Sequence, residues 1–243
     1  MLHLAYQDEA EYGEGKAQVF CVTALVFESN VVREVVQAMH SDFRDLRAGE
    51  GYDFGLLLHG TEMLPDQPDE RKRRAFEDVV KNVACFGGKL IRIGYYTREF
   101  NRLPGHPFGL IHMLMMNALT TNFSGEIIEV YEMDLSGYDR YLKTNFSGMT
   151  RHAQEFADVF GSDNISIYEP HRIIESLFCP KRASWPLMMC DVASHLLKVR
   201  HQRDTGASVG PFNSTLLRIA DSLTSHVIMD EVVRIRVRDS GSA

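Results

Sequence analysis

The sequence contains few cysteines and no long apolar segment. Its 243 residues include Cys21, Cys85, Cys179 and Cys190, and none of them forms a C-x-x-C pair or lies beside paired histidines. This spacing argues against a zinc motif and favours reduced thiols. No apolar run approaches the ~18 residues that a membrane-spanning helix needs, and no secretory signal is evident at the N-terminus. We therefore expect a cytoplasmic protein with no membrane partner.

Several common catalytic motifs are also missing. The sequence has no G-x-x-x-x-G-K-[ST], no G-x-G-x-x-G and no G-x-S-x-G, so it offers no P-loop, dinucleotide fingerprint or nucleophile elbow. Its net charge is −7, from 26 basic and 33 acidic residues. This balance argues against bulk, nonspecific affinity for nucleic acid, although it allows an enzyme with a local basic rim.

The composition that is present indicates a globular protein with a substantial core. Hydrophobic residues make up 44% of the chain and charged residues 24%. A chain of 243 residues can bury a proper core, and it shows no repeat, low-complexity segment or clear linker. We therefore treat residues 1–243 as a single domain.

Apolar patterns predict strands that alternate with helices. The first two strands are expected to pair as a hairpin, with the second buried on both faces, and Asn30 and Ser184 are expected to cap helices. The expected strands are 1–11, 19–27, 54–58, 90–96, 126–134, 165–168 and 232–237, and the expected helices are 30–47, 69–86, 108–122, 138–160, 184–201 and 213–225. This alternation predicts the α/β or α+β class with a mixed sheet.

Four acidic residues lie near the ends of apolar segments, namely Asp8, Glu62, Asp134 and Asp191. Asp8 follows the apolar part of the first strand, where Glu9 or Glu11 could take its place. Asp191 lies in a helix that is apolar nearly all round, so its carboxylate needs a partner. A solvated turn, a helix cap or a buried pair with arginine or histidine is the simpler explanation of each acid taken singly.

These acids would form an oxygen-rich metal site if folding gathers them. Mg²⁺ and Mn²⁺ prefer carboxylate oxygens, and two such ions ~3.5–4 Å apart can stabilise both oxygens of a phosphoryl displacement. His59 precedes Glu62, and His195 lies one turn after Asp191. Each histidine is a candidate for proton transfer or for orienting a carboxylate, and each also fits a structural hydrogen bond. The basic cluster Arg71–Arg74 fits either a solvated helix face or phosphate contacts.

Short motifs resemble the DUF3800 family, which is similar to a branch of the RNase H-like superfamily. The resemblance covers about residues 1 to 200 and rests on Tyr6-x-Asp8-Glu9, an apolar second strand, Thr61-Glu62-Met63, Asp134 at the end of a strand and Leu187-Met-Met-Cys-Asp191-Val-Ala. It implies an RNase H-like mixed β-sheet of about five strands flanked by α-helices, here with an extra C-terminal helix and strand. It also implies that Asp8, Glu62, Asp134 and Asp191 bind the metal.

The residues and the resemblance together predict a metal-dependent nuclease or phosphodiesterase that uses Mg²⁺ or Mn²⁺. RNA or DNA would be its partner, and metal-activated water would attack the phosphodiester. One alternative is a non-catalytic RNase H-like module for binding or assembly. Another is a metal-dependent hydrolase of a small phosphate ester.

Overall fold

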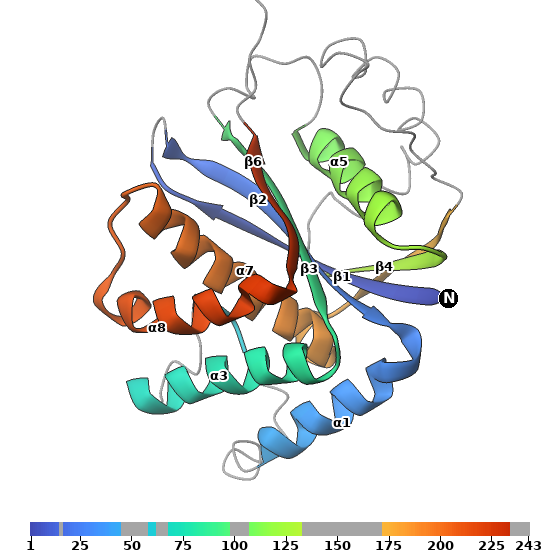
Figure 1. Ribbon diagram of the computed structural model, residues 1–243, viewed down its shortest axis with the longest axis horizontal. Coiled ribbons are helices and arrows are strands. Elements are labelled where there is room, and N and C mark those ends of the chain that lie inside the picture. Colours follow the sequence, from blue (N-terminus) through green and yellow to red (C-terminus); the bar gives the residue numbers. More distant parts are fainter. Residues whose placement is uncertain (15–16, 45–57, 62–67, 98–106, 133–171, 234–243) are drawn as a thin grey trace, which may run out of the picture.

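A six-stranded mixed sheet forms the centre of the molecule (Figure 1). The computed structural model describes residues 1–14, 17–44, 58–61, 68–97, 107–132 and 172–233. Within them the strand order is β5-β4-β1-β2-β3-β6. The strands are β1 (Leu2–Tyr12), β2 (Val19–Glu28), β3 (Lys89–Tyr96), β4 (Glu126–Glu132), β5 (Ile173–Cys179) and β6 (Val227–Val233).

The strand directions divide the sheet into two parts that meet at β1. The strands β1, β2 and β3 form an antiparallel meander, with Asp8 opposite Thr23 and Thr23 opposite Arg92. On the other side, β4 runs parallel to β1 and β5 runs parallel to β4, while β6 runs parallel to β3 at the far edge. The central strand β1 therefore has a partner on each side, which fixes its side chains rigidly.

Helices cover both faces of this sheet (Figure 1). On one face α7 (Trp185–Asp204) lies directly against β1 and β2, and α1 (Val32–Asp42), α3 (Asp69–Cys85) and α8 (Pro211–Ser222) pack around it. On the other face α5 (Pro107–Asn122) packs against β2 and β3. Short 3₁₀ turns at Ser29–Val31, Lys181–Ala183 and Leu223–His226 connect these elements.

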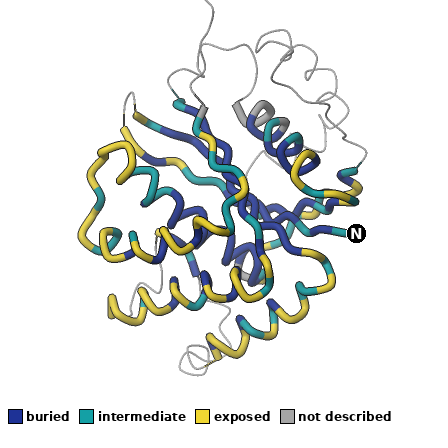
Figure 2. The backbone as a smooth tube through the Cα atoms, viewed as in Figure 1, coloured by how far each residue is buried: buried dark blue, intermediate teal, exposed yellow. Residues whose placement is uncertain are grey.

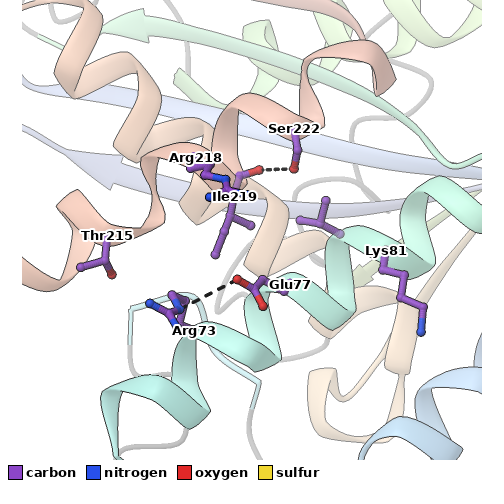
Figure 3. Close-up of a pocket in the computed structure, with 8 residues that line it drawn as sticks. Arg73, Glu77, Lys81, Thr215, Arg218, Ile219 and Ser222 are labelled. Carbon is purple, nitrogen blue, oxygen red and sulfur yellow. Dashed lines mark hydrogen bonds and ion pairs between the residues drawn. The ribbon is translucent and has the colours of Figure 1, made fainter.

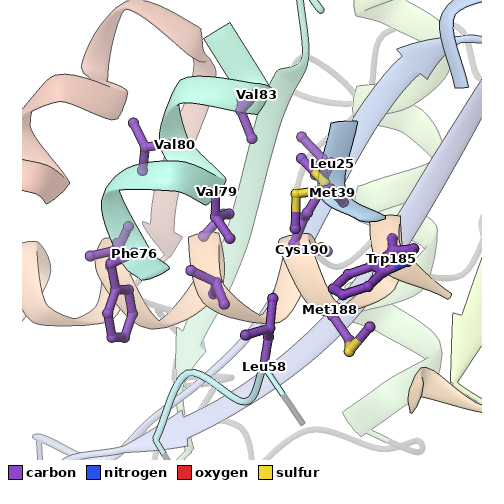
Figure 4. Close-up of a cluster of buried hydrophobic side chains, with 14 of the residues drawn as sticks. Leu25, Met39, Leu58, Phe76, Val79, Val80, Val83, Trp185, Met188 and Cys190 are labelled. Carbon is purple, nitrogen blue, oxygen red and sulfur yellow. The ribbon is translucent and has the colours of Figure 1, made fainter. Parts of the chain in front are cut away.

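A separate apolar core fills each face, and the strands between the cores are the most buried part of the chain (Figure 2). On the α7 face, side chains of α1, α3 and α7 meet in one cluster that includes Met39, Phe76 and Met188 (Figure 4). On the α5 face, Ile91 and Met115 belong to the second cluster. Burial of each large apolar side chain contributes about 1.5–3 kcal/mol to the stability of the fold. The two cores therefore stabilise β2 from both sides.

Most of the expected elements are confirmed. The hairpin of β1 and β2 forms, β2 is buried on both faces except at its last residue, and α3, β3, α5 and β4 lie where their patterns predict them. The cap at Ser184 is also confirmed, because the Leu187 backbone N–H donates to its hydroxyl oxygen at 3.3 Å. The class is therefore α/β with a mixed sheet flanked by helices.

Three local expectations are wrong. Asn30 caps no helix: it lies in a 3₁₀ turn, and α1 begins at Val32 without a side-chain cap and ends at Asp42. The last strand begins at Val227, five residues earlier than expected, where it pairs with Leu90 of β3. The edge strand β5 was not expected, because only one of its seven residues is buried and the burial shows no clean alternation. The expected elements 138–160 and 165–168, and residues 54–57 of the expected strand 54–58, lie outside the described residues.

Candidate functional site

Asp8 and Asp191 face each other across the interface between β1 and α7. Asp8 is on the side of β1 that carries Tyr6 into the α7-face core, and Asp191 lies in the second turn of α7. Each residue is only 6% exposed. Carboxylates that are buried to this extent need a partner, as the sequence led us to expect for Asp191.

The partner that joins them is Lys181, in the 3₁₀ turn between β5 and α7. Its Nζ lies 2.7 Å from Asp8 Oδ1, 3.0 Å from Asp191 Oδ2 and 2.9 Å from Glu132 Oε2 at the end of β4. An ammonium has three N–H donors, so one lysine meets one oxygen of each of these three carboxylates. We call Asp8, Glu132, Lys181 and Asp191 the carboxylate–lysine cluster.

The carboxylate–lysine cluster carries more negative than positive charge. Burial and the neighbouring Asp191 raise the pKa of Asp8 well above its usual range, and the ammonium of Lys181 only partly opposes this shift. Burial alone would lower the pKa of Lys181, but Asp8 and Asp191 outweigh that effect, so the pKa is raised and the ammonium stays charged. Next to Asp8, burial raises the pKa of Glu9 to about 7, and its Oε1 has no partner among the described residues. A further positive charge would therefore stabilise the cluster.

His59 reaches the cluster from the segment Leu58–Thr61. The Gly60 backbone N–H donates to Asp191 Oδ1 at 3.2 Å, and a Cβ at Gly60 would lie 2.3 Å from the Cβ of His195. This close approach places His59 Nε2 3.6 Å from Asp191 Oδ2. His59 Nδ1 accepts the Thr61 backbone N–H at 3.3 Å, so in the neutral ring Nε2 carries the proton and faces the carboxylate. The side chain is 33% exposed, so it can meet a ligand.

The His195 side chain is buried and therefore closed to solvent. Its Nε2 lies 3.2 Å from Asn213 Oδ1 of α8, and its ring centroid is 5.7 Å from that of Phe76. Burial lowers its pKa to about 4, so the ring is neutral at neutral pH. In this arrangement His195 donates to Asn213 and ties α7 to α8, which matches the structural alternative for this residue.

The structure thus brings together three of the six residues that the sequence suggested: Asp8, His59 and Asp191. Glu62 and Asp134 lie outside the described residues. Glu132 and Lys181 were missed. Period-two alternation along β4 could have identified Glu132, since it lies two residues before Asp134. Lys181 gave no signal, because it follows Pro180 in a turn and shows no periodicity.

The cluster has the chemistry of a magnesium or manganese site but not its arrangement. In the part of the chain that is described, no three His, Cys, Asp or Glu side chains are disposed so that they could hold a metal ion. The donors themselves are buried carboxylate oxygens, which are the ligands that Mg²⁺ and Mn²⁺ prefer. The ammonium of Lys181 lies at the point where the three carboxylates converge.

A second buried ion pair lies on the same face of the sheet. Arg92 of β3 is 2% exposed, and its Nε and Nη2 each lie 2.7 Å from Asp230 Oδ1 of β6. Arg200 of α7 is 4.0 Å from the other oxygen of Asp230. The cross-strand register Asp8–Thr23–Arg92 puts this pair two strands from Asp8, or about 10 Å.

The opposite face of the sheet contains a buried acid that is held by neutral groups. Glu129 of β4 is 1% exposed; Gln7 Nε2 donates to its Oε1 at 2.9 Å, and the Ser176 hydroxyl donates to its Oε2 at 3.3 Å. Burial raises the pKa of Glu129 to about 7. This acid therefore changes its protonation state close to neutral pH.

A surface groove of about 520 Å³ lies between α3 and α8 (Figure 3). Arg73, Lys81 and Arg218 contribute basic side chains to its walls, and Arg73 Nε lies 3.9 Å from Glu77 Oε1. None of the carboxylates of the cluster lines this groove. Arg73 belongs to the basic stretch Arg71–Arg74, which lies on the first turns of α3.

Comparison with known proteins adds no family. No protein-family model matches the chain, and no curated protein matches it. In the described part of the chain, no helix combines the length and the apolar character needed to cross a membrane. The function must therefore be argued from the carboxylate–lysine cluster itself.

Proposed function

We propose that this chain is a metal-dependent phosphodiesterase of the RNase H-like class, which hydrolyses the backbone of RNA or DNA. One observation carries the proposal: a carboxylate oxygen from each of Asp8, Glu132 and Asp191 lies within 3.0 Å of Lys181 Nζ. These three acids come from β1, β4 and α7, which are far apart in the sequence. A fold brings two buried acids and the partly exposed Glu132 together at a cost in free energy, so the cluster calls for a functional explanation.

The architecture supports the same class. The resemblance to the DUF3800 family implies a mixed sheet of about five strands flanked by helices, with an additional helix and strand at the C-terminal end. The sheet of β1 to β5 and its helices agree with this expectation, and α8 and β6 are the additional elements. Fold alone does not define activity, so the residues of the cluster must account for the chemistry.

The charge of the cluster supports a divalent cation as its cofactor. Within the described residues, three carboxylates share one ammonium, and the pKa of Asp8 remains raised in spite of it. A cation with two charges would lower the free energy of the ionised acids further than an ammonium does. Once the Lys181 ammonium has left their centre, Asp8, Glu132 and Asp191 would hold it, and Glu62 and Asp134 remain candidate ligands from the sequence.

Each side chain of the site has a distinct part in the proposed hydrolysis. A divalent cation bound there supplies Lewis acidity, which polarises a phosphate oxygen and makes water more acidic. Hydrolysis forms a bond from water oxygen to phosphorus and breaks the bond to the leaving ester oxygen, which must gain a proton. Solvent takes the proton that the attacking water loses and supplies the proton that the leaving oxygen gains. His59 fits a hydrogen bond from its Nε2–H to a phosphate oxygen, because its side chain is partly exposed. His195 would act by fixing α7, not by proton transfer.

Calorimetric titration with Mn²⁺ tests the metal site directly. Wild-type protein is expected to bind Mn²⁺, whereas Asp8→Asn and Asp191→Asn each lose a ligand and are expected to bind it at least ~tenfold more weakly. Asp221→Asn is the matched control, because Asp221 is exposed and pairs with Arg203 on the protein surface. Absence of Mn²⁺ binding by the wild type, or unchanged binding in both variants, would refute the proposed site.

Cleavage assays test the activity. Single-stranded, duplex and hybrid oligonucleotides are incubated with Mg²⁺, with Mn²⁺ and with a chelator, and a chromogenic phosphodiester is included as a small substrate. We expect cation-dependent cleavage of at least one oligonucleotide and its loss in Asp8→Asn. Cleavage of the chromogenic ester alone would instead identify a hydrolase of small phosphate esters.

One observation favours a second candidate function. Lys181 already satisfies the three carboxylates of the cluster, as a permanent structural cation would. In that case the chain is a non-catalytic RNase H-like module for binding or assembly, and the carboxylate–lysine cluster joins β1, β4 and α7 as a structural crosslink. This function predicts no Mn²⁺ binding and no cation-dependent cleavage in the two experiments above.

A further inference from the structure

Lys181 occupies the centre of the cluster, where a bound metal ion would have to meet the same oxygens. Its Nζ is within 3.0 Å of all three carboxylates, and its three N–H donors are matched by these three acceptors. A cation held by Asp8 and Asp191 would therefore compete with the ammonium for the same space and the same lone pairs. The two cannot occupy the cluster together in this arrangement.

Because Lys181 lies in a short turn, its ammonium can leave the cluster while the core stays folded. The residue belongs to the three-residue turn Lys181–Ala183, which follows the exposed Pro180 and ends at the exposed Ala183, before α7 begins at Trp185. Asp8 and Asp191, in contrast, lie on a central strand and on a helix that is buried along most of its length. Lysine has a flexible four-carbon stem, so rotation of the side chain can withdraw the charge while the carboxylates stay in place.

We propose that Lys181 is a tethered competitor of the divalent cation, which holds the site closed until metal binding displaces it. This inference rests on the proposed metal-dependent function and assigns its regulation. The closed state has the ammonium among the carboxylates, and the open state has the cation there. Metal affinity is then reduced by the fraction of molecules in which Lys181 has left the cluster.

Titration of a lysine variant with Mn²⁺ tests the competition. Lys181→Met keeps the length of the side chain and removes its charge, so it is expected to bind Mn²⁺ at least about tenfold more tightly than the wild type, since an open state populated at or below about 10% costs that factor. Lys198→Met is the matched control: Lys198 lies two turns along α7 from Asp191, with its Nζ 5.8 Å from the centroid of the Tyr12 ring. It should bind Mn²⁺ as the wild type does.

The outcomes separate this inference from the function on which it rests. Tighter binding by Lys181→Met alone supports the competition. Equal binding by the wild type and Lys181→Met overturns the competition and leaves the metal site standing. No binding by either protein removes the proposed metal site, and the competition with it.

A measurement on the wild-type chain covers the case in which Lys181→Met does not fold. Trace acetylation with acetic anhydride, followed by mass spectrometry, reports how exposed each amine is. Lys181 is 8% exposed and ion-paired, so it should react slowly without Mn²⁺ and several-fold faster at saturating Mn²⁺. The reactivity of Lys198 should not change. If saturating Mn²⁺ leaves the reactivity of Lys181 unchanged, Lys181 is not displaced and the inference is wrong.

Discussion

Two buried ionic groups on the same face of the sheet differ in how their charges balance. Cations match the acid in the first group: Arg92 makes two short contacts to one oxygen of Asp230, and Arg200 lies 4.0 Å from the other oxygen. In the carboxylate–lysine cluster, three acids share one ammonium. In the first arrangement the opposite charges offset the cost of their burial. In the second there are more carboxylates than cations, so burial still opposes the ionisation of some of the acids. The comparison teaches that the depth of burial does not distinguish the two groups, whereas the excess of acids over cations in the cluster does.

Removal of the cation from the balanced pair should have the largest effect on stability. Arg92→Met leaves the carboxylate of Asp230, which is mostly buried, without its main partner, and we expect a loss of about 3 to 5 kcal/mol in the free energy of unfolding, measured with urea. Mn²⁺ should not restore this loss. In Lys181→Met, by contrast, Mn²⁺ should recover stability, because the cation replaces the missing charge.

Arg200→Met provides the control for this prediction. Arg200 lies 4.0 Å from Asp230 and is more exposed than Arg92, so its removal should cost less than about 1 kcal/mol. If Arg92→Met costs no more than Arg200→Met, or if Mn²⁺ rescues it equally well, the contrast between the two ionic groups does not hold.

The cluster depends on a neighbouring segment, and Gly60 tests this dependence. In Gly60→Ala the new methyl group would lie 2.3 Å from His195 Cβ, so the segment Leu58–Thr61 must move away from Asp191. We expect a loss of about 1–3 kcal/mol from overpacking, measured by urea denaturation, together with weaker Mn²⁺ binding. Gly210→Ala is the control, since nothing lies within 4 Å of its added Cβ. Equal effects of the two substitutions would contradict the close packing of this segment on α7.

Glu129 extends the comparison to a buried acid that has neutral hydrogen-bond donors in place of a cation. Its folded-state pKa of about 7 lies above that of an unfolded chain, so its contribution to stability is present at low pH and is lost as pH rises through 7. Wild-type stability should therefore fall from about pH 5 to about pH 8, by roughly 1 kcal/mol per pH unit from this residue.

Urea denaturation across this pH range measures the effect. Glu129→Gln should remove that part of the slope, whereas Glu175→Gln, at an exposed position on β5, should keep the wild-type slope. The same slope in Glu129→Gln and the wild type would show that Glu129 does not titrate in this range.

The parts of the fold that follow from local patterns were predictable from the sequence. The double-sided apolar run of β2 and the capped, apolar helix α7 correspond to patterns that are set within a few residues. The edge strand β5 was not predictable, because its pairing with β4 is a tertiary interaction and only one of its residues is buried.

The same distinction explains the site. Asp8 and Asp191 were recognisable because each acid interrupts an apolar segment, which is a local signal of a buried partner. The identity of that partner was not recognisable, since Lys181 meets Asp8 only through the packing of the turn before α7 against β1. His59 was suggested by its position in the sequence, but its proximity to Asp191 depends on the absence of a side chain at Gly60.

The positive charge of the cluster comes from a short connection, not from the sheet. The turn Lys181–Ala183 lies outside β1, β4 and α7, and Ser184 caps α7, so position 181 is the point at which the charge of the cluster can be changed with the least change to these elements. Replacement of the turn by one with glutamine or histidine at position 181 would change the electrostatic potential at Asp8 and Asp191 while the surrounding scaffold remained the same. The preference of the site for one cation over another could thus be tuned through a single buried position in a short turn.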